Sequence, residues 1–275
     1  MTAAYAGIPL DRPRVMAIVN VTPDSFSDGG ERLDPARAID DGLRFVSAGA
    51  DIVDVGGEST RPGAAAVSLE EERRRVLPVL EALLPANIPL SIDTQKPELM
   101  REAAAAGAAM INDVNGFEAV GALQSVSGSD CAVCIMHKQG QPETMQQAPQ
   151  YRDVVAEVDA YLRKRIAAAE AAGIARSRLV IDPGFGFGKT LAHNLSLLRE
   201  LDRLAAAGVP VLAGLSRKSM IGALTGRDVG DRVSGSVAAA LIATQRGAAI
   251  LRVHDVAATR DVVAVFCAYR DGFEE

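Results

Sequence analysis

The sequence predicts an α/β fold, a single (β/α)8 TIM barrel with long loops after strands 1 and 2 at the catalytic face. Two observations carry this prediction: short β-rich apolar runs recur along the 275 residues, and alanine-rich amphipathic segments separate them. Strands that alternate with helices form parallel sheets, and a chain of this length is typical of a closed barrel. The alternation alone does not exclude an open doubly wound sheet.

The number of apolar runs favours the barrel. Eight runs are expected to be strands, at residues 15–19, 52–55, 90–93, 110–113, 132–136, 179–182, 211–215 and 250–253. Helix starts fall between them, at Asp34 with Pro35 and at Ser68, which can form a capping box with Glu71. Several expected helices end at a glycine shortly before the next strand, namely Gly49, Gly107, Gly173, Gly208 and Gly247. No linker divides the chain, so residues 1–275 are expected to form one domain.

Composition and charge exclude several classes of protein. Hydrophobic residues make up 48% of the chain and charged residues 23%, which is typical of a globular protein rather than a disordered one. The 29 Lys and Arg against 35 Asp and Glu give a net charge of -6. Bulk attraction to nucleic acid or to an anionic membrane is therefore not expected, and an anionic ligand would need local cations.

Cysteine usage and hydropathy indicate where the protein works. The chain has 3 cysteines, an odd number that argues against a disulfide framework and fits a reducing compartment. Cys131 and Cys134 form a C-x-x-C, but on a strand they would point to opposite faces. No stretch approaches a membrane span, and the amino terminus lacks a signal-peptide core. We expect a cytoplasmic protein.

Polar residues follow the expected strands, where the active site of such a barrel lies. A single polar residue at this position is often a helix cap. Polar residues at all these ends indicate a site. They are Asn20, Asp54, Asp93, Asn112, Asp113, His137, Asp182, Ser216, Lys218, Arg252 and His254.

Familiar catalytic motifs are incomplete. Residues 184–190, Gly-Phe-Gly-Phe-Gly-Lys-Thr, resemble a phosphate-binding P-loop, but Pro183 stands where the first glycine belongs. We expect a rigid turn with an aromatic wall instead. Zinc-binding His-Glu-x-x-His is missing from the sequence, and Gly214-Leu-Ser216-Arg-Lys218 lacks the last glycine of a nucleophile elbow.

Five segments together resemble the dihydropteroate synthase family of pterin-binding enzymes. They are residues 20–30, 56–63, 182–189, 216–219 and 252–255, and the likeness extends over essentially the whole chain. The resemblance implies condensation of a dihydropterin pyrophosphate with para-aminobenzoate, with release of pyrophosphate. It also implies that sulfonamides bind this class of enzyme. The first two segments are longer than usual βα loops, so we expect lids.

The resemblance assigns the pterin site. A pterin edge carries N–H donors beside acceptors, which calls for carboxylates, an amide and a cation. Asp93, Asn112 and Asp182 would face the donors, and Lys218 the acceptors. Asp93, Asp182 and Lys218 would also act in catalysis, and Asp28 would orient the arylamine.

The remaining roles are likewise implied by the resemblance. Pyrophosphate would be bound by Thr60, Arg61, Ser219, Arg252 and His254. Asn20 would bind the cofactor Mg²⁺, directly or through water. Para-aminobenzoate would lie among Phe26, Pro62, Phe187 and Ser216. The late helices, around the small apolar residues 237–243, would form a homodimer.

Two alternatives stay open. A pterin-binding methyltransferase barrel would share the Asp/Asn pocket but would have no use for the groups expected to hold phosphate. A catalytically silent pterin-binding paralogue would not need the complete set of assigned polar residues that this sequence retains. Release of pyrophosphate separates both from the synthase.

Overall fold

The computed structural model describes residues 4–5, 7–22, 35–59, 66–140 and 148–272. Its central feature is a closed barrel of parallel strands in the order β10-β3-β4-β5-β6-β7-β8-β9. This confirms the predicted fold class. The strands are β3 (Arg14–Asn20), β4 (Ile52–Gly56), β5 (Leu90–Asp93), β6 (Met110–Asp113), β7 (Ala132–Met136), β8 (Leu179–Asp182), β9 (Val211–Ala213) and β10 (Ala248–Val253).

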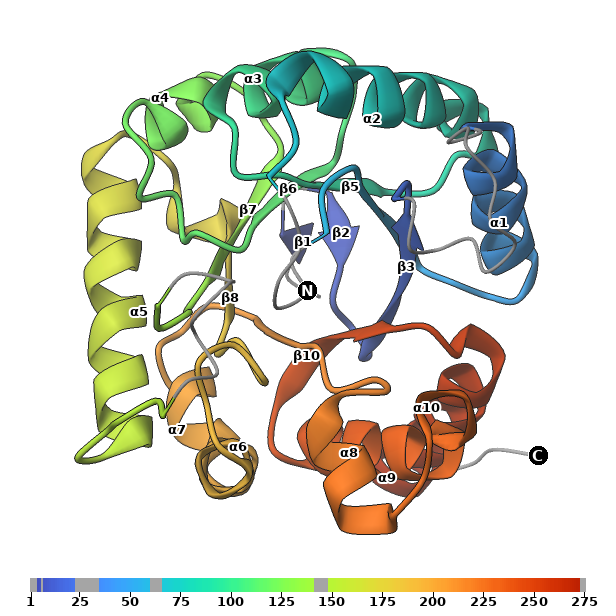
Figure 1. Ribbon diagram of the computed structural model, residues 1–275, viewed down its shortest axis with the longest axis vertical. Helices are drawn as coiled ribbons and strands as arrows, with labels where there is room; N and C mark the ends of the chain where they lie inside the picture. Colours follow the sequence, from blue (N-terminus) through green and yellow to red (C-terminus); the bar gives the residue numbers. More distant parts are fainter. Residues whose placement is uncertain (1–3, 6, 23–34, 60–65, 141–147, 273–275) are drawn as a thin grey trace.

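Helices surround the barrel as an outer ring (Figure 1). They are α1 (Pro35–Ser47), α2 (Leu69–Leu83), α3 (Pro97–Ala105), α4 (Ala122–Ser127), α5 (Val154–Ala171), α6 (Leu191–Arg199), α7 (Leu201–Ala205), α8 (Ser219–Thr225), α9 (Val233–Gln245) and α10 (Val256–Asp271). Short 3₁₀ turns occur at Leu84–Ala86, Arg176–Arg178 and Val229–Asp231. The strands β5 to β8 have the bounds that their apolar runs predict, whereas β9 ends earlier than expected, at Ala213.

The predicted helix signals mostly act as expected. Pro35 begins α1, and the Ser68 hydroxyl accepts a hydrogen bond of 3.2 Å from the Glu71 amide at the start of α2. The reciprocal half of the capping box is missing because the Glu71 carboxylate instead binds Arg74 and Arg75. Every predicted glycine stop has a positive φ, between 75° and 106°, a conformation that favours glycine.

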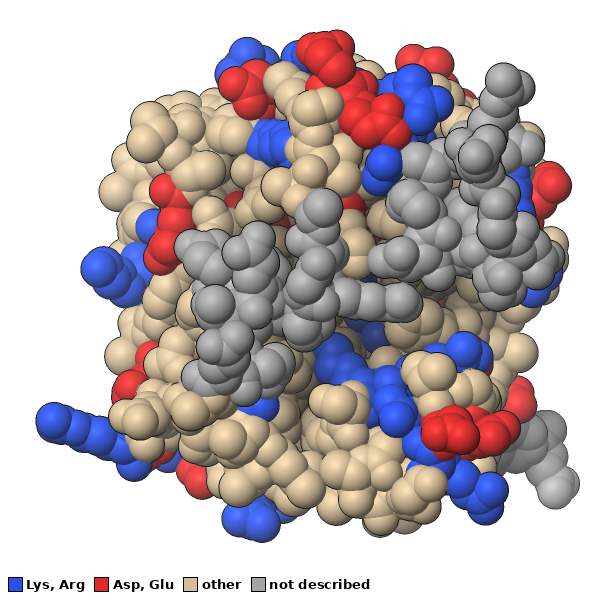
Figure 2. Space-filling view, in the orientation of Figure 1, with Lys and Arg blue, Asp and Glu red and all other residues tan. Residues whose placement is uncertain are grey.

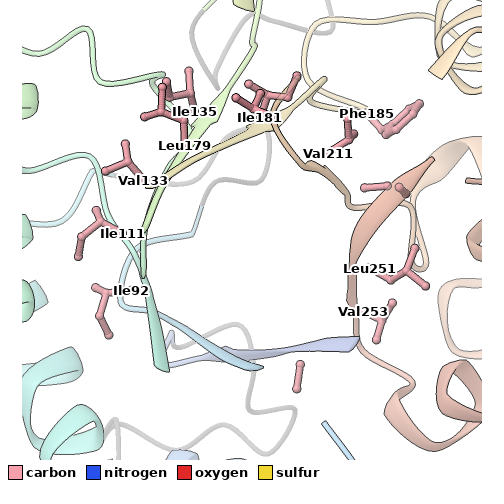
Figure 3. Close-up of a cluster of buried hydrophobic side chains, with 14 of the residues drawn as sticks. Ile92, Ile111, Val133, Ile135, Leu179, Ile181, Phe185, Val211, Leu251 and Val253 are labelled. Carbon is pink, nitrogen blue, oxygen red and sulfur yellow. The ribbon is translucent and has the colours of Figure 1, made fainter. Parts of the chain in front are cut away.

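Alternate residues of the barrel strands face two different cores. One set, including Ile92, Ile111 and Leu179, points outward against the helices (Figure 3). The other set fills the barrel interior and consists largely of Met16, Ile52, Met110, Ala132, Cys134, Val180, Leu212 and Ile250. Cys131 belongs to the outer core and Cys134 to the inner one, so the expectation of opposite faces is confirmed.

An amino-terminal hairpin was not predicted from the sequence. It pairs β1 (Ala4–Tyr5) with β2 (Ile8–Pro9) in antiparallel register, and Ile8 packs into the interior core of the barrel. Strands this short show no periodicity, which explains why sequence patterns missed them. Within the described ranges, no helix has the length and apolar character needed to cross a membrane.

Candidate active site

A small cavity lies at the carboxyl ends of the strands and gathers most of the predicted pterin residues. Asp93, Asn112 and Asp182 come from β5, β6 and β8, and Lys218 immediately precedes α8. The complete lining is Asp93, Asn112, Val114, Met136, Asp182, Phe187, Gly214, Lys218 and Arg252. Figure 2 shows Lys and Arg side chains near the centre of the face it draws, over the barrel and beside α8. A wider groove between α3 and α4 has a lining largely of alanine, glycine and serine residues.

The Arg252 guanidinium joins two carboxylates across the mouth. Its Nε donates to Asp54 Oδ2 at 2.6 Å, and its Nη2 donates to Asp93 Oδ2 at 2.8 Å. Asn112 Nδ2 donates to the same Asp54 oxygen at 3.3 Å, so Asp54 connects the arginine to the amide. Asp54 is fully buried, and its other oxygen has no hydrogen-bond partner among the described residues. Arg252 therefore lies in the pocket expected to hold the pterin, in contact with its carboxylates.

Asp182 and Lys218 form the opposite side of the cavity. Asp182 Oδ1 accepts a 2.7 Å hydrogen bond from the Gly184 amide, which fixes the carboxylate at the start of the turn after β8. Lys218 Nζ donates to the Phe185 carbonyl and lies 4.5 Å from the centre of the Phe187 ring. The predicted aromatic wall is therefore present, in contact with the predicted cation.

Burial and mutual charge shift the pKa values of these groups. Burial raises the pKa of Asp93 to about 7 despite the opposing effect of Arg252, while Asp54, Asp113 and Glu72 raise it further. Burial also raises the pKa of Asp182, against the effect of Lys218. The pKa of Lys218 is lowered to about 8, mainly by burial. The site can therefore change protonation near neutral pH, as acid–base and ligand-binding sites commonly do.

Other predicted site residues lie around this cavity. The His254 backbone amide donates to Ser216 Oγ at 3.2 Å, and its ring Nδ1 lies 3.1 Å from that oxygen. His254, which is expected to bind pyrophosphate, thus contacts Ser216, which is expected to bind para-aminobenzoate. Ser219 is exposed at the first position of α8, and Asn20 is the last residue of β3.

Side-chain oxygens of Asn20 and Asp93 lie near Gly56. A methyl group placed on Gly56 would be in ordinary contact with both, 3.9 Å from Asn20 Oδ1 and 3.8 Å from Asp93 Oδ2. Oxygen ligands are those that Mg²⁺ prefers, and this ion usually keeps waters and substrate phosphates as its other ligands. Among the residues that the structure describes, no cluster of three or more His, Cys, Asp or Glu side chains could hold a metal by itself.

Some predicted residues cannot be placed, and others were missed. Phe26, Asp28, Thr60, Arg61 and Pro62 lie outside the described residues. Sequence patterns placed Asp54 at a strand end but gave it no role. The sequence did contain a signal for it, because the alternation of side chains along β4 points Asp54 toward the interior of the barrel. Asp113, by contrast, stabilises the turn after β6: its carboxylate accepts from the amides of Asn115 and Phe117, both at 2.7 Å.

Comparisons with known proteins agree with this geometry. A profile of the family described as "Pterin binding enzyme" matches residues 16–254. The dihydropteroate synthase of Escherichia coli K12 is 51% identical over 264 residues, covering 96% of this chain and 94% of that protein. The Xanthomonas albilineans dihydropteroate synthase, solved with 4-aminobenzoic acid, is 58% identical with a TM-score of 0.91, covering 97% of each chain. A second structure of that enzyme, with 7,8-dihydropteroate, has 56% identity and a TM-score of 0.88, with the same coverage.

Replacing Asp54 by asparagine should destabilise the fold because Arg252 would lose one of its two carboxylates inside the barrel. We expect Asp54→Asn to lower the free energy of unfolding by about 1.5–3 kcal/mol, the usual contribution of a hydrogen bond to a charged group. Urea unfolding measures this. Asp41→Asn removes half of an exposed pair with Arg44 and should cost less than about 1 kcal/mol. Equal small losses for both variants would show that the buried contact is dispensable.

Proposed function

Because this chain belongs to the pterin-binding enzyme family, and within it to the dihydropteroate synthases, we propose that the cavity at its barrel mouth joins a dihydropterin pyrophosphate to para-aminobenzoate. The product would be 7,8-dihydropteroate, the compound bound in the second Xanthomonas albilineans structure. The named relatives are synthases, which favours this activity over the methyltransferase and silent-paralogue alternatives. One observation carries the proposal: Asp93, Asn112, Asp182 and Lys218 line a single cavity.

The cavity can recognise a pterin edge through complementary hydrogen bonds. Carboxylates at Asp93 and Asp182, together with the Asn112 side-chain oxygen, accept from amino and ring N–H groups. Lys218 donates to the carbonyl or ring nitrogen at the other end of the same edge. Arg252 compensates part of the negative charge at Asp93 and opposes the rise in the pKa of this carboxyl group, which favours the ionised form when the pterin enters.

The reaction would proceed through departure of the leaving group. The bond between the pterin methylene carbon and the pyrophosphate oxygen breaks, and the oxygen keeps the electron pair. The pterin cation that remains is stabilised by the carboxylates of Asp93 and Asp182. The para-aminobenzoate nitrogen then forms the new C–N bond and releases a proton. Its ring would lie beside Phe187 and Ser216, where sulfonamides, which carry a similar arylamine, should compete.

The leaving group would be held at the edge of the cavity near α8 and β10. His254 and Ser219 can donate to phosphate oxygens, and Arg252 supplies a nearby positive charge. Asn20 would hold Mg²⁺, and this ion, when bound, would neutralise charge on the departing pyrophosphate. Titration of Asn20→Ala with pyrophosphate, with and without Mg²⁺, tests the assignment, because an unchanged dependence on Mg²⁺ would contradict it.

We also propose that the late helices form a homodimer. A second proposal is that the protein works in the cytoplasm. The helix α9 contains no charged residue and exposes Ile242, while the neighbouring α10 exposes Val265 and Tyr269. Apolar side chains gathered on adjacent helices are typical of a subunit interface. All three cysteines are free, which fits a reducing compartment. Sedimentation of Val265→Glu should show dissociation, and a monomeric wild type would refute the dimer.

Asp182→Asn should preserve the fold but abolish most turnover. The asparagine oxygen can still accept from the Gly184 amide, so the turn after β8 should keep its shape. The negative charge that faces the pterin donors and steadies the cation is lost. We expect pyrophosphate release to fall at least about a hundredfold, as for other preorganised electrostatic groups. The exposed Asp261→Asn is the matched control, and near-normal turnover by Asp182→Asn with unchanged melting would reject the assignment.

Pterin affinity should rise with pH between about 5.5 and 7.5. The pKa of Asp93 is raised to about 7 in the free protein, whereas binding of the donor edge favours the ionised carboxylate. Below that pKa, binding requires release of a proton, so affinity should fall up to about tenfold per pH unit for one carboxylate. Calorimetric titration with a pterin lacking phosphates measures this dependence. Asp93→Asn should flatten the profile, and a flat wild-type profile would contradict the prediction.

A further inference from the structure

The turn at residues 183–189 contains a buried lysine that the reaction does not use. Lys189 is 3% exposed. Its Nζ lies 2.9 Å from His137 Nδ1, and it donates to the carbonyls of Gly184 at 2.9 Å and Phe187 at 3.0 Å. An ammonium group has three donors and no acceptor, so these three contacts satisfy it completely. Lys189 therefore stabilises the turn, because its ammonium group bonds both to Gly184 near the start of the turn and to Phe187 near its end.

The backbone of this turn lies directly against the segment that follows β7. A Cβ atom on Gly184 would lie 1.8 Å from the His137 carbonyl oxygen, and one on Gly188 would lie 2.2 Å from the Gln139 carbonyl oxygen. Both glycines also have positive φ values, 67° and 63°. The turn can adopt this path only with glycine at these positions, and Lys189 and His137 hold the two segments together.

The other face of the turn shapes the cavity. Phe187 presents its ring to Lys218, while its carbonyl accepts from Lys189. The Gly184 amide donates to Asp182, while its carbonyl accepts from Lys189 as well. Lys189 therefore bonds to the backbone of the two residues, Gly184 and Phe187, whose other groups contact Asp182 and Lys218 at the cavity.

We propose that Lys189 is a positioning residue for the arylamine half of the site, acting through the Phe187 ring. This inference rests on the proposed function, because it assigns the para-aminobenzoate ring to the Phe187 wall. Asp93 and Asn112 are held by β5 and β6, whereas Asp182 and Lys218 also contact the turn through the Gly184 amide and the Phe185 carbonyl, so the pterin half depends on the turn only in part. Loss of Lys189 should therefore affect the two substrates unequally.

The N–H donors of Lys189, rather than its charge alone, explain why an apolar residue would not replace it. Burial lowers the pKa of Lys189 to about 7, with Lys218 adding to the effect and Asp182 opposing it. Burial and Lys189 also lower the pKa of His137 to about 3, so its imidazole is neutral and can accept through Nδ1. A neutral amine would still provide two N–H groups for the two carbonyls, while the other tautomer of His137 could donate to its lone pair. Lys189 can therefore hold the turn together in its charged or in its neutral form.

Substitution by methionine tests the proposal because it keeps an unbranched side chain, one atom shorter, without the donors. In Lys189→Met we expect the KM for para-aminobenzoate to rise at least about tenfold, equivalent to about 1.4 kcal/mol. The Kd of a pterin without phosphates should change less than about threefold, since Asp93 and Asn112 line the cavity from β5 and β6 and not from the turn. The matched control is Lys164→Met on exposed α5, which should behave as the wild type.

A second pair of variants decides the matter if Lys189→Met does not fold. His137→Leu removes the acceptor on the ring, whereas His137→Asn offers an oxygen near the position of Nδ1. The leucine variant should raise the KM for para-aminobenzoate, and the asparagine variant should return it toward the wild-type value.

The outcomes separate this inference from the proposed function. Absence of turnover by the wild type would refute the synthase activity itself. With an active wild type, a folded Lys189→Met protein whose KM for para-aminobenzoate is unchanged would overturn the positioning role. Equal losses of pterin and para-aminobenzoate binding would overturn it too, as would equal KM values for the two His137 variants.

Discussion

The contact on which the active site depends is the double hydrogen bond from Arg252 to Asp54 and Asp93. It joins β10 to β4 and β5 inside the barrel mouth, where each partner would be costly to bury alone. Arginine suits this position because its planar fork reaches two carboxylates and stays charged at any accessible pH. Arg252 opposes the rise that burial and the Asp54 carboxylate cause in the pKa of Asp93. The ionised form of Asp93 therefore depends on the positive charge beside it.

Charge is distributed so that opposite ends of the cavity differ in chemistry. Arg252 lies with Asp93, whereas Lys218 lies with Asp182 and against Phe187. The lysine has a lowered pKa and a flexible stem, so it can turn from the Phe185 carbonyl toward a ligand acceptor. The arginine is held by two partners and is less free to move. One cation can thus adapt to the substrate while the other favours the ionised form of Asp93.

Sequence patterns predicted the elements whose residues repeat, and they failed where a role depends on three-dimensional contacts. The strands β5 to β8 and the glycine helix stops follow from local periodicity and backbone preference, which act within a few residues. Resemblance supplied Asp93, Asn112, Asp182 and Lys218, and the fold brings them to one cavity. Neither approach assigned Asp54 or Lys189, because a partner of each, Arg252 for Asp54 and His137 for Lys189, is distant in sequence. The hairpin β1–β2 was missed because its strands are too short to show a pattern.

The interior of the barrel changes from apolar to charged along its axis, and this gradient explains why the site is at one end only. Met16, Ile52 and Met110 fill the end where Ile8 packs, so that end is closed by dispersion and burial of apolar surface. Toward the other end, the same inward alternation brings Asp54, Asp93 and Arg252. Polar groups there lose hydration, and only partners or a bound ligand can compensate for that loss. The apolar end thus supplies the stability that allows the charged end to be shaped for a ligand.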